Sequence, residues 1–136
     1  MAGRSESVVS GLRWGRALIA AVLGEVVLIV VAIPIFATMA DPAPTLNLVV
    51  PPASFVVFAG VGYWSARPVP GLGLLQGALA GLIAVALYIA LGFVASRFVG
   101  GASVTDGFTP AYLLSHALKV AGGAIGGWFA ARKAAG

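Results

Sequence analysis

Cysteine is absent from this 136-residue chain, and charged residues account for only 9% of it. Without cysteine, the chain has no disulfide, no thiol nucleophile and no thiolate ligand for a metal. The only histidine is His116, and the acidic residues are scattered along the sequence. No metal-binding set and no Ser/His/Asp arrangement for nucleophilic catalysis can be assembled from them. We therefore expect no metal, no cofactor and no enzymatic activity.

Hydrophobic residues, in contrast, make up 60% of the chain, a fraction well above that of a soluble domain. A helix of roughly 17 to 25 mainly apolar residues crosses the hydrocarbon core of a bilayer and satisfies its own backbone hydrogen bonds there. Four such runs occur, at about residues 17–40, 48–64, 71–96 and 111–131. The sequence therefore predicts an all-α integral membrane bundle of four transmembrane helices, with residues 1–136 as one domain.

Two details of these runs affect their limits. The first run is longer than the apolar region of a signal peptide, which is usually 7 to 15 residues, so we expect a retained span rather than a cleaved leader. The second run begins near the pair Pro51 and Pro52, because proline usually marks the start of a helix or a turn.

The net charge of +4 comes largely from basic residues at the ends of the predicted spans. Cytoplasmic loops of membrane proteins carry an excess of Lys and Arg. A cytoplasmic N-terminus places most basic residues inside: Arg4, Arg13, Arg16, Arg67, Arg132 and Lys133. Arg97 then lies outside, and four spans return the C-terminus to the cytoplasm. We expect both termini on the cytoplasmic side of a bacterial inner membrane, and no nucleic-acid partner.

Two charged residues, Glu25 and Lys119, fall inside predicted spans. At 1.5 Å per residue from the cytoplasmic side, Glu25 is about 12 to 15 Å deep and Lys119 about 18 Å deep. An unpaired charge at mid-bilayer costs at least about 2.5 kcal/mol. We therefore expect an ion pair, with His116 and Ser115 joining it from the face of the fourth span that carries Lys119. The alternative is that each group is neutral and hydrogen-bonded separately.

Glycines recur at four-residue spacing in the third and fourth spans. Such small-xxx-small pairs let two helix backbones approach closely. The glycines with this spacing are Gly73, Gly77, Gly81, Gly122, Gly123, Gly126 and Gly127. They predict close packing inside one bundle, or alternatively a homodimer interface. Gln76 lies near the cytoplasmic end of the third span, so we expect it to be solvated or to hydrogen-bond a neighbour, and it has no assigned chemistry.

Two functions fit this sequence. The first is a non-enzymatic accessory, scaffold or structural subunit, in which Glu25 and Lys119 hold the first span to the fourth. Its partners would be the lipid bilayer and either a second copy of the chain or a larger membrane protein. The second is a small proton- or ion-coupled transporter that uses Glu25 as the coupling group, because ionisable residues inside membranes often mark transport pathways.

Overall fold

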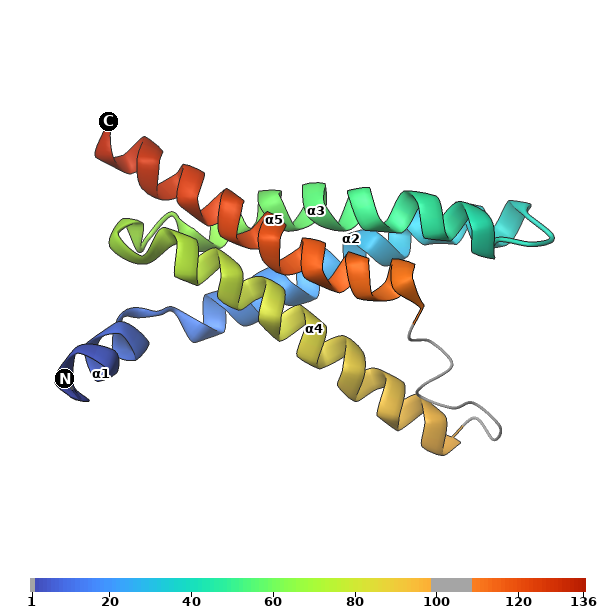
Figure 1. Cartoon of the computed structure of the whole chain (residues 1–136), viewed down its shortest axis with the longest axis horizontal. Helices are drawn as coiled ribbons and strands as arrows, with labels where there is room; N and C mark the ends of the chain where they lie inside the picture. Colours follow the sequence, from blue (N-terminus) through green and yellow to red (C-terminus); the bar gives the residue numbers. More distant parts are fainter. Residues whose placement is uncertain (1, 99–108) are drawn as a thin grey trace.

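The structure is a computed structural model that describes residues 2–98 and 109–136, with side chains from residue 7 onward. Its secondary structure in these ranges is entirely helical (Figure 1). The elements are α1 (Ala2–Gly11), α2 (Trp14–Thr38), α3 (Ala43–Ala66), the short 3-10 helix η1 (Pro70–Leu72), α4 (Gly73–Phe98) and α5 (Pro110–Ala135). The predicted all-α class is therefore confirmed for the described part of the chain.

Within these ranges, three helical segments are long and apolar enough to cross a membrane. They are α2, α3 and the continuous segment of η1 and α4. α5 has a comparable length of 26 residues, but Lys119, His116 and several glycines make it less apolar. By length and composition these segments suit a membrane protein, and α5, the fourth predicted span, is not among them.

The helix limits differ from the predicted ones by a few residues at both ends. α1 was not predicted, and α3 begins at Ala43 instead of near residue 48. Proline is tolerated in the first helical turn because the N–H that it lacks has no partner there, so Pro44 fits the start of α3. Pro51 and Pro52 lie inside α3 and do not start it. The predicted link between the third and fourth spans falls mostly on residues 99–108, which lie outside the described residues. The side chain of Arg4 is also outside the described part of the chain.

α5 packs against both α3 and α4 along much of its length, as the crossing helices in Figure 1 show. Toward α4, Gly123 and Gly127 of α5 lie against the backbone at Gly77 and Gly73. A Cβ atom at any of these four positions would overlap the facing backbone. The two helices therefore approach as closely as their main chains allow.

The adjacent glycines of α5 serve the contact with α3. Gly122 lies against the backbone of Phe55, and Gly126 lies against that of Ala59. Gly123, which faces α4, also lies against Gly62 of α3, so the consecutive glycine pairs of α5 allow close contact with both partner helices.

α2 packs on α3 and α4, and its backbone makes little contact with α5. Its buried surface consists mainly of small side chains such as Ala17, Ala20 and Ala21. Gly24 lies against the ring of Phe58, which extends from α3 and is fully buried. Large apolar side chains such as Ile29 and Val30 are exposed on the outer face, as expected for residues that contact lipid.

Candidate functional site

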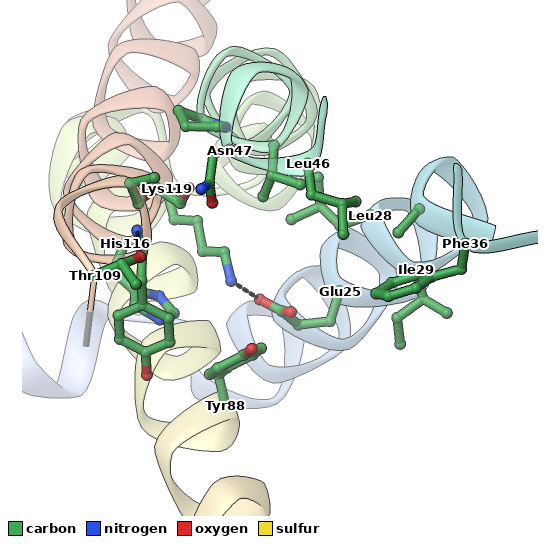
Figure 2. Close-up of a pocket in the computed structure, with 16 residues that line it drawn as sticks. Glu25, Leu28, Ile29, Phe36, Leu46, Asn47, Tyr88, Thr109, His116 and Lys119 are labelled. Carbon is green, nitrogen blue, oxygen red and sulfur yellow. Dashed lines mark hydrogen bonds and ion pairs between the residues drawn. The ribbon is translucent and has the colours of Figure 1, made fainter. Parts of the chain in front are cut away.

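The structure brings together Glu25 of α2 and Lys119 of α5, as their depths predict. Lys119 Nζ donates a hydrogen bond to Glu25 Oε1 at 2.5 Å, and the pair is also an ion pair (Figure 2). The lysine side chain is only 4% exposed, whereas the glutamate side chain is 17% exposed. The carboxylate is therefore the more open member of the pair.

Aromatic rings complete the surroundings of the lysine. Lys119 Nζ lies 5.0 Å from the ring centre of Tyr88 and 5.8 Å from that of Phe58. Ring faces attract a cation, but they do not accept hydrogen bonds as an oxygen atom does. Glu25 is consequently the one hydrogen-bond acceptor that the described residues provide for this ammonium group.

His116 lies beside the ion pair, as predicted, and lines the same cavity, but it makes no hydrogen bond to the pair in the described residues. Its ring packs against those of Tyr88 and Tyr112, with ring centres 5.0 and 4.3 Å away, and the two tyrosine rings also contact each other, with centres 5.4 Å apart. Its buried Nδ1 atom has no hydrogen-bond partner in the same part of the chain. The helical spacing placed His116 correctly on the face of Lys119, but tyrosines occupy the space around the imidazole.

Ser115 is also buried near the pair without contacting it. Its hydroxyl donates to the carbonyl oxygen of Ala111 in the preceding turn of α5, at 2.8 Å. A serine in a helix commonly satisfies its hydroxyl in this way. The predicted polar cluster is thus reduced to the pair of Glu25 and Lys119, with His116 and Ser115 next to it.

A cavity of about 380 Å³ lies beside the ion pair. Its walls come from α2, α3, α4 and α5, and Figure 2 shows their side chains around the pair. Glu25 and Lys119 are the charged residues of this wall, and Leu28, Ile29 and Phe36 are among its apolar residues. The cavity extends from the pair toward the α2–α3 connection, away from the end of the bundle where both chain termini lie.

Gln76 hydrogen-bonds its neighbours, one of the two expectations for it, through partners that the sequence did not identify. The side chain is fully buried in α4. Its Oε1 accepts from the Arg13 backbone N–H at 2.9 Å, and its Nε2 donates to the Arg13 carbonyl at 3.0 Å and to Ser65 Oγ at 2.9 Å. Gln76 thereby joins the start of α2 to α3 and α4. A polar residue in an otherwise apolar span was the only signal for it.

Arg16 makes a second link at the same end of the bundle. Its guanidinium lies 3.8 Å from the ring centre of Trp64 and donates to the Trp64 carbonyl at 2.7 and 3.2 Å. This arginine therefore has a structural contact in addition to its position near the predicted cytoplasmic surface.

The predicted packing glycines all lie at contacts within one chain. Gly73, Gly77 and Gly81 face α5, and Gly122 and Gly126 face α3. Each of them is buried, so this seam is already occupied by the chain's own helices. The chain matches no protein-family model, no curated protein and no solved structure, so its function is inferred from this geometry alone.

Proposed function

We propose that the chain is a non-enzymatic four-helix protein of a bacterial inner membrane, with both termini in the cytoplasm. α5 is the fourth span in this proposal. Its length, the basic residues Arg132 and Lys133 in its last turn, and its outward-facing Leu113 and Leu114 support this assignment. The position of both termini at one end of the bundle also fits an even number of crossings (Figure 1).

In this proposal the pair of Glu25 and Lys119 is a clasp that holds α2 to α5. The single observation that carries it is the hydrogen-bonded ion pair between two helices whose backbones have little contact. Lys119 is buried, and Glu25 is the one carboxylate that the described residues place beside its ammonium group. The pair thus fixes how the outer helix α2 sits on the glycine-packed unit of α3, α4 and α5.

The experiment is a mutant cycle with Glu25→Leu, Lys119→Leu and the double variant. Removing one partner leaves a buried charge alone and is expected to cost about 3 to 5 kcal/mol of unfolding free energy. Replacing both with leucine removes both charges and should return the stability to within about 1 kcal/mol of the unmodified protein. Unfolding in mixed micelles, followed by circular dichroism, measures these changes. A double variant as unstable as either single variant would contradict the clasp.

A second candidate is a small ion-coupled transporter, and the cavity beside the partly open carboxylate of Glu25 favours it. A coupling carboxylate needs access to solvent, and the cavity supplies such a route on one side. Proteoliposomes should then show solute or proton flux that Glu25→Gln abolishes. Flux that is unchanged in this variant would remove the transport role of Glu25.

A further inference from the structure

The cavity beside the ion pair has the size of a binding site for a small molecule. Its volume of about 380 Å³ lies at the lower end of the roughly 300 to 1,000 Å³ that is usual for ligand sites. Charged groups occur at one end of the cavity, where Glu25 and Lys119 meet, and the remaining wall is mainly apolar, with uncharged polar residues such as Asn47 and Thr109 among its members. A suitable ligand therefore has a polar end and an apolar end.

The ion pair retains unused hydrogen-bonding capacity. Glu25 uses Oε1 for Lys119, and the described residues provide no donor for its second carboxylate oxygen. Lys119 has three N–H donors, of which its hydrogen bond to Glu25 uses one, and its ammonium group also lies near the rings of Tyr88 and Phe58. Both members of the pair can bind a ligand without separating from each other.

Charge balance then selects the ligand class. The pair is neutral as a unit, so a ligand with a single charge would leave a net charge within an apolar wall, which costs free energy. A zwitterion adds no net charge and offers an ammonium group for the carboxylate and an anionic group for the ammonium. Its own two charges are also solvated by these partners.

We propose that this cavity binds a small zwitterion with an apolar group. The ammonium of the ligand contacts Glu25, its anionic group contacts Lys119, and its apolar group packs against Leu28, Ile29 and Phe36, all of which line the cavity. The clasp alone does not require this binding site, which therefore goes beyond the proposed structural role.

The test uses the full-length protein in a nonionic maltoside detergent, which contributes no zwitterion. Leucine and phenylalanine serve as probes, with glycine as the zwitterion without an apolar group. Isoamylamine and 4-methylpentanoate are matched analogues that retain only one of the two charges of leucine. Calorimetric titration should show binding that increases from glycine to the larger amino acids and is at least tenfold weaker for either analogue.

Two tryptophan variants make the result specific to the cavity. Ile29 lines the cavity and is exposed on α2, whereas Ile33, one turn further on, is exposed but is not part of the cavity wall. Ile29→Trp should fill the cavity and abolish binding while leaving the ion pair intact, and Ile33→Trp should bind as the unmodified protein does. Absence of binding by every amino acid, equal binding of a singly charged analogue, or unchanged binding in Ile29→Trp would overturn the proposal.

Zwitterions reach such a cavity either from water or from lipid headgroups. Nanodiscs of phosphatidylglycerol, with and without phosphatidylethanolamine, distinguish the two sources. Suppression of leucine binding by phosphatidylethanolamine supports a headgroup as the natural ligand, and unchanged binding supports a soluble one. The clasp is tested separately, by the unfolding free energies of Glu25→Leu, Lys119→Leu and the double variant. Either proposal can therefore fail without the other.

Discussion

At the scale of single residues, the polar side chains in the bundle fall into two groups with different surroundings. Glu25 and Lys119 meet near the middle of their helices, beside a cavity. Gln76 lies instead near the end of the bundle that carries the termini, where it is fully enclosed by protein. The first group retains capacity to bind a ligand, whereas the hydrogen bonds of Gln76 are used within the chain.

Gln76 therefore gives a prediction about stability alone. Gln76→Leu removes three hydrogen bonds and leaves the buried hydroxyl of Ser65 without its glutamine partner. An unsatisfied buried polar group costs about 1 to 3 kcal/mol, and we expect a loss of this size in unfolding free energy. The control is Leu75→Ala at the neighbouring exposed position, which should change stability less. Equal effects of the two variants, measured by unfolding in mixed micelles, would contradict the proposed link.

At the scale of helices, the glycines of α4 divide into those that touch a neighbour and those that do not. Gly77 lies against the backbone of Gly123, whereas a Cβ atom at Gly92 would meet no atom within 4 Å. Gly77→Ala must push α4 away from α5 and should destabilise the protein by about 1 to 3 kcal/mol. Gly92→Ala adds no clash and should be neutral or stabilising by up to about 1 kcal/mol, because alanine favours a helix more than glycine does.

Thermal unfolding monitored by circular dichroism checks both glycine variants in the same detergent. The comparison is matched because both positions lie in α4 and both substitutions add one methyl group. Similar unfolding temperatures for the two variants would contradict the close contact between α4 and α5.

The features predictable from sequence are those that depend on residue type and helical spacing. The need to compensate a buried charge and the matching depths led to the pair of Glu25 and Lys119, and four-residue spacing identified the glycine stripes. The hydrogen bonds of Gln76 depend instead on where the start of α2 meets α4. The packing of the His116 ring depends on Tyr88, which belongs to a different helix. Contacts of this kind depend on how the helices are placed relative to one another. The residue spacing within a single helix does not predict that placement.

At the scale of the whole molecule, the open question is whether α5 crosses the membrane like the three more apolar segments. Its inward face carries Lys119 and the glycines, which lower its hydropathy, but these groups contact α2, α3 and α4. Leu113, Leu114, Ile125 and Phe129 are exposed on the other face and suit lipid. A helix whose polar residues are buried against neighbouring helices can span a bilayer even when its mean hydropathy is modest.

Because the chain has no cysteine, single cysteines can report its topology without a background signal. Suitable positions are exposed: Ser10 before α2, Ala40 between α2 and α3, and Ala134 near the end of α5. In intact cells, a membrane-impermeant maleimide should label Ala40→Cys and leave Ser10→Cys and Ala134→Cys unmodified. Both of these should react once the cells are permeabilised, since four crossings return the chain to its starting side.

Each alternative topology has a distinct labelling pattern in the same experiment. If α5 did not cross, Ala134→Cys would react in intact cells together with Ala40→Cys while Ser10→Cys stayed protected. If the protein were inverted, Ser10→Cys and Ala134→Cys would react and Ala40→Cys would not. The four-span arrangement also puts the cavity in the outer half of the bundle, because it extends from the ion pair toward the α2–α3 connection. Labelling of Ala40→Cys in intact cells would therefore fix the side from which a zwitterion enters as the extracytoplasmic one.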